Sequence, residues 1–323
     1  MRILIWHVHG SWTTSFVQGR HEYLVPVLPD RGPDGRGRAR TWDWPGSVTE
    51  LSPDDLRATA ADGGIDAVVL QRPHEVDLVH DWTGLRAGVD VPAVYVEHDT
   101  PREHAVTSRH PLAAQSTIPV VHVTWFNHLM WDCGDAPTRV VEHGIIDPGA
   151  LWTGEDPSLA VVVNEPVRRG RIAGTDLVVR FGRELPLHVY GMGMAELGQF
   201  APHLAPTLHE DYPQADMHRA LGRHRVYLHP YRWTSLGLSL LEAMTIGMPV
   251  LALSATEAPR AVPPEAGLLS NDPAQLESRA REWLADPGAA AAAGAAAREH
   301  ALAHYGVGRF LADWDEILTE VGS

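Results

Sequence analysis

A glutamate stands on the apolar side of a short predicted helix in the stretch "TSLGLSLLEAMTIGMPV", residues 234–250. Gly237 permits a tight turn before this helix, and the free N–H groups of a first helical turn favour an anion. Glu242 follows inside the helix, where a carboxylate among apolar neighbours is costly to bury unless it accepts hydrogen bonds. A ribose diol offers two donors. The spacing therefore suits a nucleotide, with phosphates at the turn and ribose at Glu242. The alternative is a glutamate that is merely solvated at the edge of the helix.

Polar residues also follow two predicted strands in the N-terminal half. The segment "HVHGSW" leaves the first strand through Gly10, and "VEHDTP" ends a later strand at His98. His7 and His9 alternate across the end of the first strand. Because two histidines at this spacing have no third ligand in view, they are a weak signal for a metal site, and we predict none. For His98 the alternative is a histidine that only caps its strand.

Short apolar runs rich in β-branched residues recur along the chain with helical stretches between them. Continuous apolar strands flanked by helices are typical of parallel sheets that are buried on both faces. Residues 147–158 are rich in Pro, Gly and acids, which indicates a linker between two such sheets. The predicted strands are residues 2–8, 66–72, 92–98, 120–125 and 139–144, followed by 160–165, 187–193, 225–231 and 249–254.

This pattern predicts an α/β protein with two doubly wound parallel-sheet domains, and the length of 323 residues agrees with two domains. Ligands bind such sheets at the carboxyl ends of the strands, so we expect the site in a cleft between the domains. The Ala-rich residues 285–306 predict a surface helix interrupted at Gly294. Residues 309–321 predict an amphipathic helix that packs against another part of the chain.

The composition of the chain limits which macromolecules it can bind and in which compartment it is expected. The formal net charge of −15 argues against nucleic acid and against an anionic membrane surface as a general partner. The single cysteine, Cys133, excludes an intrachain disulfide, and we expect its thiol to be packed. No apolar run approaches the length of a transmembrane helix, and the N-terminal residues lack the pattern of a secretory signal. We expect a cytoplasmic protein. All 26 basic residues are arginines, which suggests a GC-rich, bacterial genome.

The segments "SLGLSLLEAM" and "GMPV" resemble the nucleotide-sugar motif of GT-B glycosyltransferases, specifically the retaining group-1, GT4-like family. Three further segments are similar to the family's in the same order: "VVEHGIIDPG", "VVVNEPVRRGRIAGTDL" and "LHVYGMG". The resemblance implies two Rossmann-like domains facing each other across a cleft. It implies an acceptor-binding domain over residues 1–150, a donor-binding domain over 159–305, and a C-terminal helix over 306–323 that packs back on the first domain.

The resemblance also implies roles for residues of the donor-binding domain. Glu242 would hold the ribose of the donor, and Arg169 would neutralise the leaving diphosphate, with Arg168 and Arg171 able to share that task. The alternative for these arginines is a solvated surface run. The other implied donor-binding residues are Asn164, Thr234, Ser235, Leu236, Gly237 and Leu238.

In the N-terminal domain the resemblance implies that Gly10 belongs to a loop over the donor phosphates. It implies that His98 faces the donor sugar as the catalytic candidate, with an imidazole that can donate or accept a hydrogen bond. The acceptor-binding residues are unknown, and His9 and Trp12 are the candidates. This family needs no metal at the diphosphate, because cationic side chains and helix dipoles act there.

The predicted function is transfer of a sugar from a nucleotide diphosphate sugar to an acceptor hydroxyl, with retention and without a metal or other cofactor. Two positions depart from the family pattern: Thr234 stands at an acidic position, and Asn164 stands at a phosphate-binding arginine. They motivate the alternative of a non-catalytic nucleotide- or sugar-binding partner. The other alternative is a nucleotide-sugar epimerase on the same fold, which would turn over the donor without an acceptor.

Overall fold

The computed structural model describes residues 1–322, which divide into two compact units. Unit 1 comprises Met1–Gly144 together with the C-terminal segment that begins at Val307. Unit 2 comprises Ile145–Gly306. The chain thus leaves unit 1 near the start of the predicted linker and returns to it at Val307, two residues after the predicted donor-binding domain ends.

Unit 1 is built on a seven-stranded sheet in the order β3-β2-β1-β4-β5-β6-β7, in which every pair of neighbours is parallel. Its core strands are continuously apolar because helices cover both faces of such a sheet. The strands are β1 (Arg2–Ile5), β2 (Glu22–Pro26), β3 (Val48–Leu51), β4 (Ala67–Leu70), β5 (Ala93–Glu97), β6 (Val120–His122) and β7 (Thr138–Val140). The helices are α1 (Gly10–Phe16), α2 (Pro53–Ala61), α3 (Glu75–Thr83), α4 (Trp125–Met130) and α13 (Val307–Val321).

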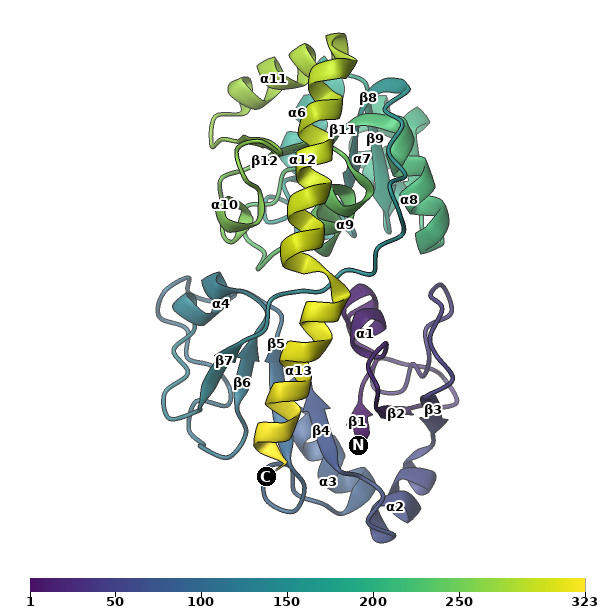
Figure 1. Cartoon of the computed structure of the whole chain (residues 1–323), viewed down its shortest axis with the longest axis vertical. Helices are drawn as coiled ribbons and strands as arrows, with labels where there is room; N and C mark the ends of the chain where they lie inside the picture. The colour runs from purple at the N-terminus through teal and green to yellow at the C-terminus, as the bar shows by residue number, and fades with distance from the viewer. Residues whose placement is uncertain (323) are drawn as a thin grey trace. The chain divides into compact units, whose positions relative to one another are not determined.

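Unit 2 repeats this architecture with a six-stranded parallel sheet in the order β10-β9-β8-β11-β12-β13 (Figure 1). The strands are β8 (Asp156–Val162), β9 (Leu187–Gly191), β10 (Leu208–Glu210), β11 (His224–His229), β12 (Val250–Ala252) and β13 (Gly267–Leu269). The helices are α5 (Pro166–Arg169), α6 (Thr175–Glu184), α7 (Met194–Phe200), the 3₁₀ helix η1 (Pro202–Thr207), α8 (Gln214–Arg223), α9 (Leu238–Ile246), α10 (Ala258–Ala261), α11 (Pro273–Ala285) and α12 (Pro287–Tyr305). The prediction of two doubly wound parallel sheets is confirmed.

Each of the nine predicted strands coincides with an observed one, but all nine observed strands end earlier than the predicted runs. Residues 2–8, for example, form a strand only as far as Ile5. Four strands were not predicted: β2, β3, β10 and β13. Three of these four lie at sheet edges, where a strand of three or four residues carries too few apolar positions to stand out.

The amphipathic helix predicted near the C-terminus is confirmed as α13. It belongs to unit 1 and contacts α1 and β5 (Figure 1). Its buried aromatic residues, Phe310 and Trp314, meet the ring of Trp12 edge-on, with centroids 5.9 and 5.6 Å away. These contacts place α13 in the core of unit 1.

The predicted interruption of the Ala-rich helix at Gly294 is wrong. Helix α12 runs unbroken from Pro287 to Tyr305, and Gly294 is buried inside it. A Cβ atom on Gly294 would lie 2.2 Å from the carbonyl oxygen of Gly247, which follows α9. The glycine is therefore a point of close backbone contact between α12 and the end of α9, and the helix is not the plain surface helix that its composition suggested.

Two predictions concern the chain as a whole. Within residues 1–322, no helix is long and apolar enough to cross a membrane. Cys133 is a buried free thiol, and burial raises its pKa to about 11, so it is packed as expected.

Candidate functional site

In unit 2 the loops after β8 and β11 meet at the place where the strand order reverses. This position is the topological switch point at which doubly wound sheets bind ligands. The backbone N–H of Arg232 donates to the carbonyl of Ile172 over 3.0 Å. Gly174 has a φ of 75°, and a Cβ there would lie 2.1 Å from the Pro230 carbonyl oxygen. The two loops are therefore packed together by close backbone contact.

The turn before α9 has the form that the sequence predicted. Gly237 is the N-cap of the helix, and the turn that precedes it contains Ser235 and Leu236, both buried. A Cβ on Gly237 would lie 2.5 Å from Cε1 of His229 at the end of β11. Burial lowers the pKa of His229 to about 3, so this ring is neutral. The neutral imidazole and the missing side chain together set the path of the turn.

Glu242 is 4 % exposed, so the alternative of a solvated edge glutamate does not hold. Its Oε2 accepts a hydrogen bond of 2.7 Å from the side-chain amide of Gln214 at the start of α8. The ring Nε2 of His218 lies 3.4 Å from the same oxygen. Sequence reasoning missed both partners. The only signal for them is a pair of polar residues four positions apart, which on a helix share one face.

The three arginines after β8 have different surroundings. Arg168 pairs with Glu165, and Arg171 pairs with Asp176. The guanidinium of Arg169 lies over the ring of Tyr231, 5.2 Å from the centroid. Within residues 1–322, Arg169 has no carboxylate at ion-pair distance. It is therefore the arginine of this cluster whose charge an anion could neutralise.

The two positions that depart from the family pattern have clear locations. Thr234 is partly exposed in the turn before α9, as is Leu238 at the first position of the helix. Asn164 is exposed after β8, and its amide oxygen accepts a hydrogen bond of 3.0 Å from the backbone N–H of Met192. Asn164 thus joins the loop after β8 to the loop after β9.

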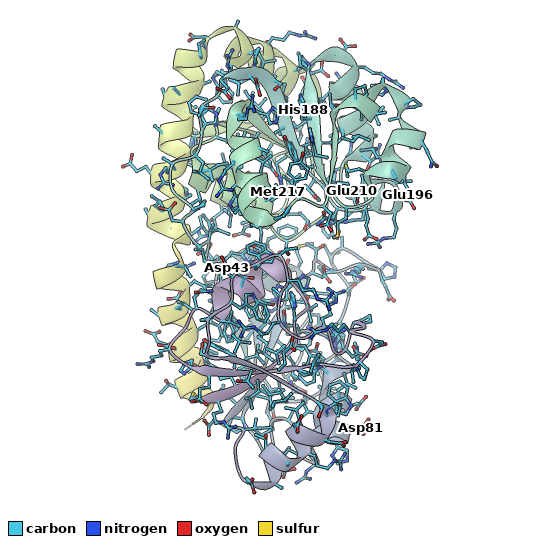
Figure 2. The ribbon with its side chains drawn as sticks, turned by 90° about the vertical axis from the view of Figure 1, so that its right-hand side faces the viewer. Asp43, Asp81, His188, Glu196, Glu210 and Met217 are labelled. Atoms are coloured by element: carbon cyan, nitrogen blue, oxygen red, sulfur yellow. The ribbon has the colours of Figure 1, made fainter. Side chains whose placement is uncertain are left out.

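A carboxylate occupies the start of α7 in the same unit. Glu210, labelled in Figure 2 near Glu196 of α7, accepts hydrogen bonds from the backbone N–H groups of Gly193 and Met194 over 2.8 and 2.7 Å. These are two of the donors that an anion would otherwise use. We therefore expect phosphate binding at the turn before α9 and not at α7.

Unit 1 has a pocket of about 630 Å³ at the carboxyl ends of β1, β4 and β5. This is again the place where the strand order reverses, between β1 and β4. Another cavity of this unit, about 540 Å³, lies at the amino ends of β5 and β6, where such sheets do not usually bind ligands. The residues that line the first pocket include His9, Gln71, Arg72, His98, Asp99 and Trp131.

His98 is half-buried in this pocket beside other rings. Its ring centroid lies 4.0 Å from that of His9 and 5.0 Å from that of Trp12. Burial lowers the pKa of His98 well below the ordinary value, and the neighbouring His9 and His143 lower it further. Burial also lowers the pKa of His9 to about 4, although the Asp99 carboxylate opposes that shift. Both imidazoles are neutral at physiological pH. His98 Nε2 lies 3.0 Å from the amide oxygen of Gln71.

The other predicted residues of unit 1 lie close by. Gly10 is the first residue of α1, directly after His9. Trp12, the second candidate for a residue that binds the acceptor, is 1 % exposed. Its ring stacks on that of Phe16, with the two centroids 5.0 Å apart. Its position does not support acceptor binding, because its faces are covered by core side chains. His9 lines the pocket and stays a candidate.

No group of three or more His, Cys, Asp or Glu side chains in the described part of the chain could hold a metal ion. His7, which with His9 formed the weak signal for a metal site, makes a hydrogen bond of 3.0 Å with the carbonyl oxygen of Gly37.

Comparison with known proteins adds the family context. Residues 168–315 match a family model described as "Glycosyl transferase-like". None of the curated protein sequences matches the chain significantly.

Solved structures of similar fold cover almost the whole chain. The sucrose-phosphate synthase of Thermosynechococcus elongatus is 13 % identical with a TM-score of 0.73, covering 99 % of both chains. HepE of Anabaena, in complex with UDP, is 11 % identical with a TM-score of 0.68, covering 99 % of this chain and 100 % of its own. A glycosyltransferase of Rickettsia africae is 12 % identical with a TM-score of 0.63, covering 99 % and 98 %. At these identities the likeness shows the fold, which is that of GT-B glycosyltransferases.

Proposed function

We propose that this chain, a glycosyltransferase-like protein of the GT-B fold, transfers a sugar from a nucleotide diphosphate sugar to an acceptor hydroxyl. One observation carries the proposal: the buried carboxylate of Glu242 stands behind the Gly237 turn, at the switch point of the unit 2 sheet. On the adjoining loop lies Arg169, which contacts Tyr231 and has no carboxylate at ion-pair distance within residues 1–322. This combination supplies a carboxylate that can accept hydrogen bonds from a ribose, backbone N–H groups that can bind phosphate, and a cation, all within one set of loops.

Each group has a distinct part in the proposed reaction. Glu242, held by Gln214, accepts hydrogen bonds from the ribose hydroxyls. The backbone at Ser235–Leu238 receives the diphosphate or the sugar hydroxyls. Arg169 balances the charge that grows on the diphosphate as the glycosidic bond breaks, so its effect is largest in the transition state.

We propose that the acceptor binds in the unit 1 pocket, which His9 and His98 line. We also propose that His98 is the catalytic residue that faces the donor sugar, as the resemblance implies. Retention of configuration and independence from metal belong to the proposal through the resemblance alone. With retention, the leaving phosphate would take the proton of the acceptor hydroxyl on the same face of the sugar. The proposed reaction uses the nucleotide sugar as a substrate and needs no cofactor.

The nucleotide is tested first by ligand-induced stabilisation with UDP, GDP, ADP and dTDP. Because HepE is described with UDP and with UDP-glucose, UDP is the first candidate. At a hundredfold excess over the dissociation constant, the bound nucleotide should add about 2.7 kcal/mol to the free energy of unfolding. Absence of stabilisation by all four would contradict the proposal.

Transfer is then tested with the matching nucleotide sugar and a panel of sugar, glycan and lipid acceptors. Release of nucleotide that depends on the acceptor, with a glycosylated product, supports the transferase. Conversion of the donor without an acceptor would instead indicate an epimerase. Tight nucleotide binding without any reaction would indicate a non-catalytic binding protein, the alternative that Thr234 and Asn164 motivate.

A further inference from the structure

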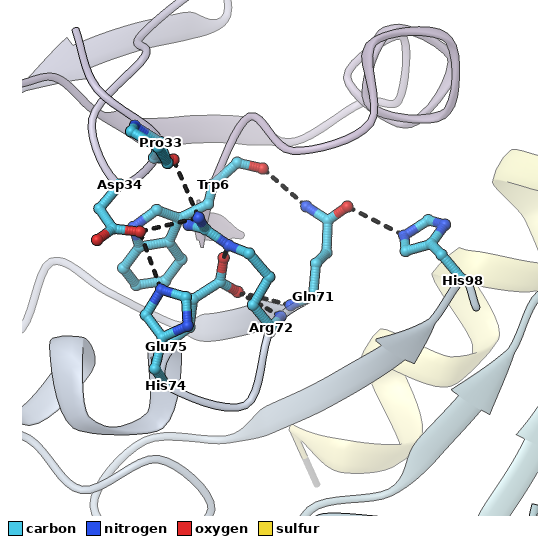
Figure 3. A network of polar contacts seen from close by, with 8 residues as sticks. All are labelled: Trp6, Pro33, Asp34, Gln71, Arg72, His74, Glu75 and His98. Carbon is cyan, nitrogen blue, oxygen red and sulfur yellow. Dashed lines mark hydrogen bonds and ion pairs between the residues drawn. The ribbon is translucent and has the colours of Figure 1, made fainter. Parts of the chain in front are cut away.

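Gln71 directly follows β4 and links the backbone of unit 1 to the ring of His98 (Figure 3). Its side chain is almost fully enclosed, with 5 % of the residue exposed. The amide nitrogen donates a hydrogen bond of 2.7 Å to the carbonyl oxygen of Trp6. Since a carbonyl oxygen only accepts, the NH₂ group must face Trp6 and the amide oxygen must face His98.

This orientation decides which nitrogen of His98 carries the proton. The amide oxygen of Gln71 is an acceptor, so His98 Nε2, 3.0 Å away, must be the donor. The ring is neutral because burial disfavours its charged form. A neutral imidazole has one proton only. Nδ1 of His98 therefore carries a lone pair and can accept a hydrogen bond but cannot donate one.

Gln71 is itself held from the other side. Its backbone N–H donates to the buried Glu75 carboxylate over 2.6 Å, and Arg72 Nε donates to the same carboxylate over 2.7 Å. Asp34 lies 2.8 Å from Arg72 Nη1 and 2.9 Å from His74 Nε2 (Figure 3). This network fixes the turn between β4 and α3, and with it the direction of the Gln71 side chain.

We propose that Gln71 is a positioning residue that holds His98 in the tautomer with Nε2 protonated, so that Nδ1 accepts a hydrogen bond from a sugar hydroxyl. The inference rests on the proposed function, because it assigns the hydrogen-bonding direction of the proposed catalytic histidine. It narrows that role: His98 recognises a hydroxyl group through its hydrogen and does not donate to an oxygen.

The tautomer can be read directly by long-range ¹H–¹⁵N NMR on protein labelled with ¹⁵N-histidine. The signals of His98 are identified as those that vanish in His98→Gln. We expect a protonated Nε2 and an unprotonated Nδ1 in the wild type. In Gln71→Met, which keeps the side-chain length but has no acceptor oxygen, the ring should populate both tautomers. Gln18→Met is the matched control, since Gln18 is an exposed glutamine of the same unit whose side-chain amide donates to the backbone carbonyl of Thr14.

A protonated Nδ1 in the wild type would overturn the proposal, and this result needs no variant. An unchanged tautomer in folded Gln71→Met would also overturn it, because the ring would then be set by its stacking neighbours. If Gln71→Met does not fold, the wild-type spectrum and Gln71→Glu decide, since Glu keeps an acceptor oxygen and should keep the tautomer.

Kinetics separate this inference from the proposed function. With the donor that the wild type uses, Gln71→Met should lower kcat about tenfold, the loss expected for one hydrogen bond, and leave nucleotide affinity unchanged. Donor analogues in which fluorine replaces one sugar hydroxyl cannot donate a hydrogen bond from that position. For one of these analogues, the loss of kcat relative to the natural donor should be larger in the wild type than in Gln71→Met. Equal penalties in both proteins would refute the inference. Absence of transfer by the wild type, with the tautomer responding to Gln71→Met, would refute the proposed function and leave the tautomer assignment in place.

Discussion

The side-chain amide of Gln214 on α8 donates a 2.7 Å hydrogen bond to Glu242 Oε2 on α9. The two residues are 28 positions apart and belong to helices that contact each other in unit 2. The bond restricts the carboxylate to one orientation before any ligand arrives. A carboxylate fixed in this way loses little conformational freedom on binding, which favours affinity for a ribose diol.

Replacing Glu242 by alanine should weaken binding of the nucleoside diphosphate by about 1.5–3 kcal/mol, the range for hydrogen bonds to a charged group. Calorimetric titration measures the change, and circular dichroism checks that the protein is folded. Glu196→Ala is the control, because Glu196 is exposed on α7 in the same unit. Unchanged affinity in folded Glu242→Ala would show that the carboxylate does not bind the nucleotide.

Arg168 and Arg169 are adjacent, but within the described residues Arg168 pairs with a carboxylate, that of Glu165, whereas Arg169 lies over the ring of Tyr231. Arg169→Gln should therefore lower kcat by about 10²–10³-fold, as expected when one group that stabilises developing charge is lost. Arg168→Gln should change kcat by less than about fivefold, because Arg168 already pairs with Glu165 and an exposed ion pair contributes up to about 1 kcal/mol. Steady-state kinetics with both variants test this. Equal effects would mean that the cluster acts as a unit or is a surface feature.

The turn before α9 has no room for a side chain at position 237. A Cβ there would lie 2.5 Å from the His229 ring, so Gly237→Ala should reduce the free energy of unfolding by about 1–3 kcal/mol and weaken nucleotide binding. Adding His229→Ala removes the obstructing ring, and the double variant should recover part of the nucleotide affinity. Urea denaturation and calorimetry measure both quantities. If the double variant binds no better than Gly237→Ala, the ring is not what constrains the turn.

The sequence predicted the sheets and the residues at their carboxyl ends because both depend on local pattern. Apolar runs mark buried parallel strands, and a polar residue directly after such a run lies at the ligand-binding edge. Gln71 follows its strand just as His98 does, so the same rule could have found it.

The pairings between side chains could not be predicted in this way. The Gln214–Glu242 bond depends on how α8 packs against α9. The Gln71–His98 bond depends on the rotamers of two residues that directly follow adjacent strands. Gly294 is a similar case. The low helix propensity of glycine suggests a break in the helix at this position. The helix continues because Gly294 packs closely against Gly247, a tertiary contact that overrides local propensity.

Two glycines in helices should respond oppositely to alanine. In Gly294→Ala the new Cβ would lie 2.2 Å from a backbone oxygen that cannot move freely, so the free energy of unfolding should fall by about 1–3 kcal/mol. Gly308 in α13 has no atom within 4 Å of a Cβ position. Gly308→Ala should therefore raise stability by up to about 1 kcal/mol through helix propensity. Chemical denaturation of both variants tests this, and a stabilised Gly294→Ala protein would contradict the packing described for α12.

Five histidines whose pKa values are lowered by desolvation should make the protein less stable as the pH falls. Burial lowers the pKa of His122, His143 and His229 to about 3, and that of His9 and His224 to about 4. Their contribution to stability is fully present above pH 6.5, the ordinary histidine pKa, and is lost as the pH falls from 6.5 towards the folded values. In that window the unfolded chain binds protons that the folded protein does not. Each histidine can remove about 1.4 kcal/mol per pH unit.

Two buried acids act in the opposite direction. Burial raises the pKa of Glu75 and of Glu97, so each binds a proton more readily in the folded protein and opposes the loss as the pH falls. Because the histidines outnumber these acids, the free energy of unfolding should decrease between pH 6.5 and 5 in urea titrations. His143→Leu should reduce the slope by up to one proton, whereas His80→Leu, at an exposed position of α3, should leave the slope unchanged. A flat profile for the wild type, or equal slopes for the two variants, would show that these histidines are protonated in the folded protein at pH 5.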